Sequence, residues 1–301
     1  MAILAGCGDL QPGAVQAGAP FAAARRDNAK GGKRVFFSAI DSGHSARIFI
    51  FTYPDLKLVS YVQGVTGSGL CTDHQGNVWV ATGPNIEEIS YDGALLGIEQ
   101  DRYGLAFGCA VDIGSDTLAL TNSNGNVVLL PGDGSQSGIA YPTGLTATYY
   151  CAYDNQGNLF VTGLNGQKPE LLELPSGKPS FTKLSIDKPI DGAYDIEWDG
   201  SHLALEASHK GNVITIYQLS VAGNQATVTQ TTHLAAQDYR FWPQGYQFAI
   251  AGGTVLQSAG HNSKRLELWH YPAGGNAYRH AQWKSLGISH IGALTLDSPG
   301  S

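Results

Sequence analysis

The sequence predicts an all-β protein, a six-bladed β-propeller with four-stranded antiparallel blades, and three observations carry this prediction. A short apolar run that ends in Asp is followed by a tight turn and a second apolar run, most clearly at Gly69–Gly83 and Tyr150–Gly163. The first apolar residue after each turn recurs in steps of 43, 40, 41, 44 and 52 residues, which is the spacing of propeller blades. Few residues are charged (14%) and 39 are Gly, as short strands joined by tight turns require. The six markers are Val35, Val78, Leu118, Leu159, Leu203 and Val255.

The first blade lacks one strand, and the end of the chain supplies it. Only Val35–Ala39, Arg47–Tyr53 and Leu56–Val62 are available at the start of the repeat. The segment Gly292–Asp297 repeats the apolar-to-Asp pattern of the innermost strands, as at Gly69–Asp73. We therefore expect the C-terminal strand to join the first blade and close the ring, which removes an open sheet edge.

Composition divides the chain into residues 1–33 and a propeller at residues 34–301. The sequence Leu4-Ala5-Gly6-Cys7 resembles the lipobox of bacterial lipoproteins, which implies lipidation of Cys7 and a signal peptide. Residues Gly8–Lys33 have the Gly, Ala and Pro content of a flexible linker. This reading predicts an exported protein, lipid-anchored on the periplasmic or cell-surface face of a bacterial membrane. The alternative is a tail with one incidental cysteine, because only three residues precede Leu4.

Charge and cysteine placement narrow the function. The net charge of −7 disfavours a nucleic-acid partner, because phosphate binding needs a basic surface. Cys71, Cys109 and Cys151 fall in successive innermost strands and are expected to be small buried apolar residues, with a disulfide between neighbouring blades as the alternative. No spacing typical of a zinc site and no Gly-x-Ser-x-Gly elbow occurs, so no metal ligand, cofactor or catalytic residue is predicted.

The repeated Gly-x-x-x-Asp-x-x-Gly-Asn unit resembles the NHL-type and gluconolactonase-like six-bladed propellers, over residues 34–297. Lactonases of this class hold a divalent metal on the ring axis with a Glu, two Asn and an Asp from different blades. An enzyme of this class would here use Glu206, Asn122 or His209 at the axial opening. The chain departs from their pattern, since Trp198 stands where the fifth blade should have its Asp.

The resemblance also implies a ligand-binding face, at the end of the ring where the loops that enter the inner strands meet. The insert Asp238–Tyr246 contributes an aromatic and Arg-rich cluster to this face, suited to recognition. Alternatively, Phe241 and Trp242 plug the channel mouth. The predicted face consists of Arg102, Tyr103, Asp191, Glu206, His209, Tyr239, Arg240, Trp242 and His290.

These features favour a binding or scaffold module for a protein, peptide or glycan over an enzyme. The alternative function is a metal-dependent hydrolase or lyase of the gluconolactonase-like class.

Overall fold

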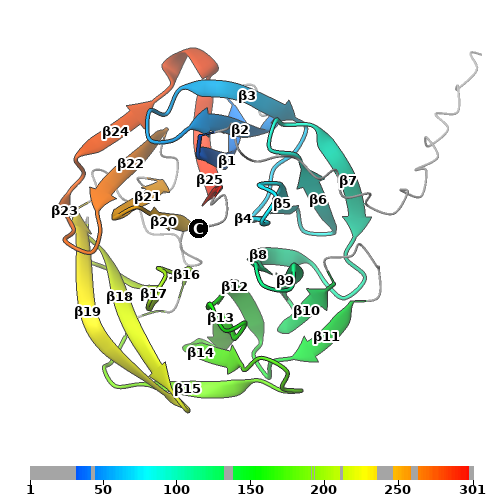
Figure 1. Ribbon diagram of the computed structural model, residues 1–301, viewed down its shortest axis with the longest axis vertical. Helices are drawn as coiled ribbons and strands as arrows, with labels where there is room; N and C mark the ends of the chain where they lie inside the picture. The colour runs from blue at the N-terminus through cyan, green and yellow to red at the C-terminus, as the bar shows by residue number, and fades with distance from the viewer. Residues whose placement is uncertain are drawn as a thin grey trace, which may run out of the picture.

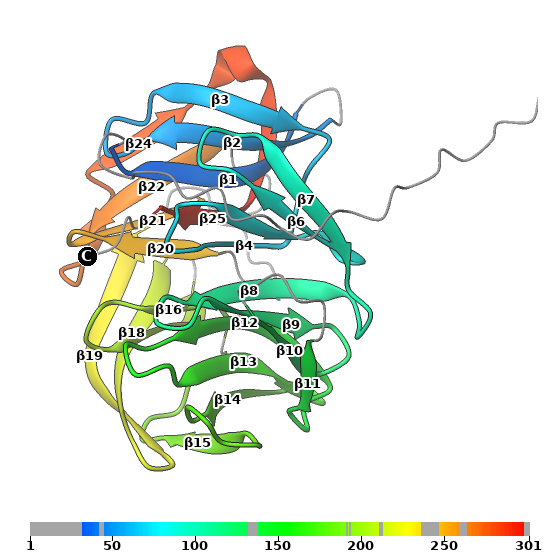
Figure 2. The same ribbon diagram turned by 45° about the vertical axis from the view of Figure 1, so that its right-hand side comes forward.

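A computed structural model describes residues 32–41, 45–131, 138–190, 192, 194–210, 213–235, 247–258 and 264–297. The described chain is all-β, with one short 3-10 turn, η2 (Lys284–Leu286), as its only helical element. Its sheets follow one another around a central axis in a propeller-like ring (Figure 1). The view turned by 45° shows neighbouring sheets packed one against the next around that axis (Figure 2).

Four of the sheets are four-stranded and antiparallel. One comprises β4 (Gly69–Thr72), β5 (Val78–Ala81), β6 (Asn85–Ile89) and β7 (Leu95–Gln100). The next comprises β8 (Ala106–Asp112), β9 (Thr117–Asn122), β10 (Asn126–Leu130) and β11 (Ile139–Pro142). A third comprises β20 (Phe248–Ala251), β21 (Thr254–Ser258), β22 (Arg265–His270) and β24 (Arg279–Gln282). The fourth has the order β25-β1-β2-β3 and comprises β1 (Arg34–Asp41), β2 (Ala46–Thr52), β3 (Leu58–Gln63) and β25 (Ile288–Leu296).

The remaining strands form a single nine-stranded sheet, so the described chain has five sheets where the sequence predicts six. Its first part is β12 (Ala147–Tyr153), β13 (Leu159–Asn165), β14 (Lys168–Leu174) and β15 (Thr182–Ile186). Its second part is β16 (Ile196–Trp198), β17 (Leu203–Lys210), β18 (Val213–Ala222) and β19 (Gln225–Ala235), and β23 (Gly275–Asn276) pairs with β19. A parallel contact between β15 and β19 joins the two parts, through Ser185 opposite Gln225 and Ile186 opposite Ala226.

The predicted ring closure is confirmed. Strand β25 pairs with β1 in antiparallel register, with Val35 opposite Leu296 and Phe37 opposite Leu294. In Figure 2, β25 lies beside β1 although the two strands are at opposite ends of the sequence. The closing strand therefore covers the edge that β1 would otherwise expose.

The turns between inner and second strands have the chemistry that the repeat predicts. In the β12–β13 turn, Asp154 Oδ1 accepts hydrogen bonds from the backbone N–H groups of Gln156 (2.8 Å) and Asn158 (2.9 Å). Gly157 adopts a positive φ of 76°, which glycine reaches without steric cost. Asp73 holds the β4–β5 turn in the same way.

The fifth repeat differs from its predicted alignment. Asp199, one residue after Trp198, holds the β16–β17 turn by accepting from the N–H groups of Ser201 (2.9 Å) and His202 (2.7 Å). The repeat therefore has its Asp, and the substitution by Trp198 inferred from the sequence is wrong by one position.

Neighbouring sheets approach closely near the axis, because their inner strands converge there. A Cβ on Gly69 would lie 2.6 Å from the Gly108 Cα, and one on Gly108 would lie 2.5 Å from the Tyr149 carbonyl oxygen. Hydroxyls of second strands donate to the backbone at the following inner strand. Thr121 on β9 donates to the Tyr149 carbonyl on β12 (2.5 Å), and Thr162 on β13 donates to the Tyr194 carbonyl just before β16 (2.5 Å).

The core lies between the sheets, where apolar side chains of facing sheets pack together. At the junction of the first and last sheets, Phe37 stacks on Phe51 with a centroid distance of 5.2 Å and on Trp283 at 5.4 Å. Because each core is shared by two sheets, a sheet cannot bury its faces alone, and the ring is expected to fold as one unit.

Candidate binding site

A cavity of about 380 Å³ lies on the ring axis. The six inner strands β4, β8, β12, β16, β20 and β25 all contribute to its lining. Among the lining residues, one from each of these strands, are Cys71, Cys109, Cys151, Glu197, Ala249 and Thr295. This size is within the range of sites that hold small molecules or single side chains.

A disulfide joins Cys71 of β4 to Cys109 of β8 across neighbouring sheets. The Cα atoms are 5.7 Å apart, within the span that a disulfide needs. The expectation that these two residues are reduced apolar side chains is therefore wrong for this pair, because the convergence of the inner strands brings them within bonding distance. Cys151 is a free buried thiol, as expected, and burial raises the pKa of its thiol.

Glu197 is the carboxyl that has no structural partner in this cavity. It lies on β16, and no described residue donates a hydrogen bond to its side chain. Burial raises the pKa of Glu197 to about 8. The described residues that line the cavity include two other carboxyls, Asp112 and Asp154, and no Lys, Arg or His.

Asp112 and Asp154 are already engaged in their turns. Asp112 accepts hydrogen bonds from the Gly114 N–H (3.1 Å) and the Ser115 hydroxyl (2.6 Å). Asp154 accepts three, from Gln156 and Asn158. Glu197 is thus the one lining carboxyl of the described residues to which no hydrogen bond is donated, so both of its oxygens are left for a ligand.

The cavity reaches the surface at the end of the ring where the inner strands turn into the second strands. Ile113, in the β8–β9 turn, is 59% exposed, and Asn155 in the β12–β13 turn is exposed as well. Trp198 also lines the cavity, and its indole N–H donates to Asn155 Oδ1 (3.0 Å). We call this opening, formed by Ile113, Gly114, Asn155 and Trp198, the turn-side mouth.

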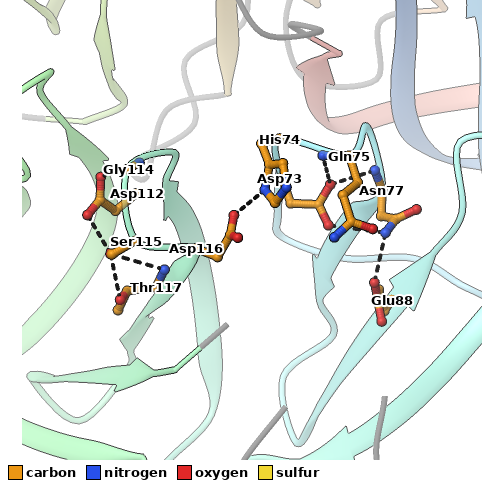
Figure 3. A network of polar contacts seen from close by, with 10 residues as sticks. All are labelled: Asp73, His74, Gln75, Asn77, Glu88, Asp112, Gly114, Ser115, Asp116 and Thr117. Carbon is orange, nitrogen blue, oxygen red and sulfur yellow. Dashed lines mark hydrogen bonds and ion pairs between the residues drawn. The ribbon is translucent and has the colours of Figure 1, made fainter. Parts of the chain in front are cut away.

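Acidic turns surround this end of the axis. Figure 3 shows His74 in the β4–β5 turn pointing toward Asp116 in the β8–β9 turn, and the two side chains form an ion pair when the imidazole is protonated. The carboxyl groups that end inner strands here are Asp73, Asp112, Asp154, Asp199 and Asp297.

Burial and the charges of neighbouring carboxylates raise the pKa of Asp297, which is one of these residues, and of Glu88 on the nearby strand β6. The pKa of Asp297 is raised to about 6, mainly by burial and partly by the charge of Asp73, while Arg34 opposes the shift. The pKa of Glu88 is raised to about 7, first by burial and then by Asp73. In Figure 3, Glu88 lies below Asn77, whose Nδ2 donates to Glu88 Oε1 (3.1 Å).

Direct contacts between inner strands that are not neighbours narrow the opposite end of the axis. The Gln247 side chain pairs with the Leu70 backbone, accepting from its N–H (2.9 Å) and donating to its carbonyl (2.6 Å). The Tyr150 hydroxyl donates to the Ser68 carbonyl (3.3 Å). Gln247 thus joins the start of β20 to β4, past the intervening β25.

Two further carboxyls are buried and accept hydrogen bonds from residues of β20 and β21. Asp195 accepts from the Phe248 N–H (2.6 Å), and Glu206 Oε2 accepts from Gln257 Nε2 (2.6 Å). Burial raises the pKa of Glu206 to about 8 and that of Asp195 well above its usual range, with the neighbouring carboxyls adding to the shift at Asp195.

The described members of the sequence-predicted face lie in one loop and on two strands of different sheets. Arg102 is exposed and Tyr103 half-buried in the β7–β8 connection, Glu206 is buried on β17, and His290 is half-buried on β25. None of these four residues lines the axial cavity. His209 lies on β17 but its side chain is outside the described residues, as are Cys7, Asp191, Tyr239, Arg240 and Trp242.

Asn122, the remaining ligand considered with Glu206, is buried at the end of β9. Among the described residues, no group of three or more His, Cys, Asp and Glu side chains has the arrangement of a metal site. The described residues also contain no helix with the length and apolar character needed to span a membrane.

Glu197 was missed by sequence reasoning, because the fifth repeat was aligned on Trp198. Alignment on Asp199 places Glu197 two residues before the turn Asp, as Cys71 precedes Asp73 and Thr295 precedes Asp297. That position lines the axis, so the corrected register would have identified it.

Comparison with known proteins supports the fold alone. No family model matches the chain, and no curated protein matches it. A solved structure of a protein of unknown function from Bacteroides caccae superposes with a TM-score of 0.63 at 13% identity, covering 88% of this chain and 99% of the other. A functionally unknown protein from Desulfotomaculum acetoxidans DSM 771 superposes with a TM-score of 0.58 at 15% identity, covering 88% and 90%.

Proposed function

We propose that this chain is an exported, lipid-anchored six-bladed propeller that binds a protein, peptide or glycan partner through its axial cavity. The observation that carries the proposal is the cavity itself, which opens at the turn-side mouth and holds Glu197 with no structural partner among the described residues. A rigid ring that presents such a cavity is suited to recognition, because little order has to be gained on binding.

The six-blade count follows from dividing the nine-stranded sheet at its parallel contact. Strands β12–β15 and β16–β19 each pair in antiparallel order, as the strands of the four-stranded sheets do. Only two residue pairs join β15 to β19. We therefore count two blades fused by their outer strands, and we place the chain with the NHL-type and gluconolactonase-like propellers on the repeat described above.

The disulfide supports export. A disulfide between Cys71 and Cys109 is typical of proteins in oxidising compartments and rare in the bacterial cytosol. It agrees with lipidation at Cys7 and an anchor on the periplasmic or cell-surface side of the membrane.

Partner capture with a blocked mouth tests the proposal. Gly114 is exposed, lines the cavity and has a φ that other residues adopt, so Gly114→Trp places an indole at the mouth with little strain. Membrane-fraction pull-downs and a glycan array should give a partner with the wild-type protein that Gly114→Trp loses. Gly32→Trp, at an exposed glycine away from the cavity, should retain it. No partner in either assay, or equal capture by Gly114→Trp, would overturn the proposal.

A second candidate, a metal-dependent hydrolase or lyase, is favoured by the buried carboxyls Asp195 and Glu206. Strongly perturbed carboxyl pKa values are found at catalytic and metal sites more often than elsewhere. Metal analysis of the purified protein, with lactone hydrolysis assayed in the presence of calcium or zinc, decides this candidate. A stoichiometric divalent ion whose binding Glu206→Gln abolishes would support it, and the absence of both metal and hydrolysis would eliminate it.

A further inference from the structure

We propose that the axial cavity accepts a primary alkylammonium group, such as a lysine side chain of a peptide partner, with the Glu197 carboxylate as its counter-ion. This inference rests on the proposed function and specifies the chemistry of the bound group.

The charged side chains that line the cavity favour a cationic ligand over an anionic one. Its described residues include Asp112, Asp154 and Glu197 and no basic side chain. Since the two Asp residues are occupied by their turns, a cationic group can pair with Glu197 and still lie in the field of the two others. An anion would find no counter-charge there.

The arrangement of apolar and charged groups in the cavity favours a ligand with an alkyl chain and a positive charge at its end. Entry leads past the exposed Ile113 side chain and the Trp198 ring at the turn-side mouth. These apolar surfaces suit an aliphatic stem, and the ammonium group then reaches the depth of β16, where Glu197 lies. The lysine side chain combines both features.

A single available carboxyl is better matched to an ammonium ion than to a divalent metal. Calcium takes six to eight oxygen ligands. Asp112 and Asp154 already use part of their acceptor capacity within their turns, so Glu197 is the one carboxylate in the described lining with both oxygens open to a metal. An ammonium group needs only a carboxylate and one or two further acceptors, which hydroxyls such as that of Thr295 can supply.

Binding is coupled to the release of a proton. The empty cavity holds Glu197 largely as the neutral acid at neutral pH, because its pKa is about 8. When the ammonium group enters, the carboxyl loses its proton to solvent and the ion pair forms. The affinity should therefore rise about tenfold per pH unit below a pH of about 8 and level off above it, while the lysine amine stays protonated.

Calorimetric titration with two small probes tests the inference. The probes are Nα-acetyl-lysine methylamide and its norleucine counterpart, which has a similar stem and no charge. The wild-type protein should bind the lysine probe, with an affinity that increases from pH 6 to pH 8, and should bind the norleucine probe at least tenfold more weakly. Glu197→Gln should lower the affinity for the lysine probe at least tenfold and remove its pH dependence.

The matched control is Glu87→Gln, which neutralises a carboxyl on β6 whose pKa burial also raises but which does not line the cavity. It should bind the lysine probe as the wild-type protein does. A Tm of Glu197→Gln at least as high as that of the wild-type protein would show that the loss of affinity is local, because an amide at this position has no proton to lose.

Equal binding of the two probes, no binding of the lysine probe, or wild-type affinity in Glu197→Gln would overturn the inference. Its failure can be told apart from that of the proposed function. If Gly114→Trp loses a partner that Glu197→Gln retains, the cavity binds a group other than an amine. If Gly114→Trp retains the partner, binding does not use the cavity at all.

Discussion

At the scale of single residues, the fold depends on aspartates that hold turns and on glycines that let strands converge. Asp154 satisfies two backbone N–H groups and the Asn158 amide at one turn, and Asp73 does the same in the second blade. Gly69 and Gly108 stand where neighbouring inner strands meet. Replacing such an aspartate removes hydrogen bonds, whereas replacing such a glycine introduces a steric clash.

Replacing Asp154 by Ala leaves the N–H groups of Gln156 and Asn158 without their acceptor. Hydrogen bonds to a charged group contribute about 1.5–3 kcal/mol each, and water replaces part of this at a surface turn. We expect Asp154→Ala to lower the free energy of unfolding by about 1–3 kcal/mol in chemical denaturation. Asp55→Ala, at an exposed carboxyl, should change it by less than about 0.5 kcal/mol, and equal effects would contradict the assigned role.

Replacing Gly108 by Ala creates a steric clash. The added Cβ would lie 2.5 Å from the Tyr149 carbonyl oxygen and 3.0 Å from Thr121 Oγ1, so two inner strands would have to separate. Overpacking of this kind costs about 1–3 kcal/mol. Thermal unfolding should show a clear decrease for Gly108→Ala and almost none for Gly32→Ala, where no atom lies within 4 Å of the added Cβ. A wild-type Tm for Gly108→Ala would refute the close approach.

At the scale of strands and sheets, the disulfide links β4 and β8, which belong to different sheets and share no backbone hydrogen-bond ladder. It closes a loop of 38 residues between β4 and β8. Chain-entropy arguments assign about 4 kcal/mol to a loop of this length, and measured values are commonly smaller.

We therefore expect the double variant Cys71→Ser and Cys109→Ser to lose about 2–4 kcal/mol of unfolding free energy. Cys151→Ala, which removes the free thiol, serves as the control and should lose less. Mass spectrometry of the unreduced protein should show one disulfide that forms between Cys71 and Cys109. A disulfide that includes Cys151 would contradict the assignment.

The strands and their pairing differ in how far they could be predicted from the sequence. The repeat of apolar runs and turn residues located all six inner strands and the closing role of β25, because turn chemistry and strand period are local signals. The parallel contact of β15 with β19 was not predicted, since it involves two residue pairs and has no turn signal. The carboxyl of Glu197 was missed for a different reason, a one-residue error in aligning the fifth repeat at Trp198.

At the scale of the whole molecule, buried carboxyls make stability depend on pH. The pKa values of Glu88, Glu197, Glu206 and Asp297 are raised to about 7, 8, 8 and 6. In each case the folded protein binds the proton more tightly than the unfolded chain does. The tighter proton binding therefore stabilises the folded state fully at a pH below the ordinary carboxyl pKa near 4. This contribution to the free energy of unfolding is lost as the pH rises through about 6–8.

Thermal unfolding should accordingly give a Tm that rises as the pH is lowered from 9 to about 5, until other groups titrate. Glu206→Gln should flatten this dependence, because the amide stays neutral at every pH. Asp55→Asn should leave it unchanged. A Tm that falls over this range in the wild-type protein would contradict the directions given for these carboxyls.

The claim that the ring binds its partner at the turn-side mouth is tested most directly by site-specific photo-cross-linking in membranes. A benzophenone side chain is placed at Ile113, on the turn-side mouth, or at Tyr103, on the face predicted from the sequence, where the loops enter the inner strands at the other end of the ring. The account predicts a discrete cross-linked partner from Ile113 and none from Tyr103. A partner captured from Tyr103 and not from Ile113 would contradict it.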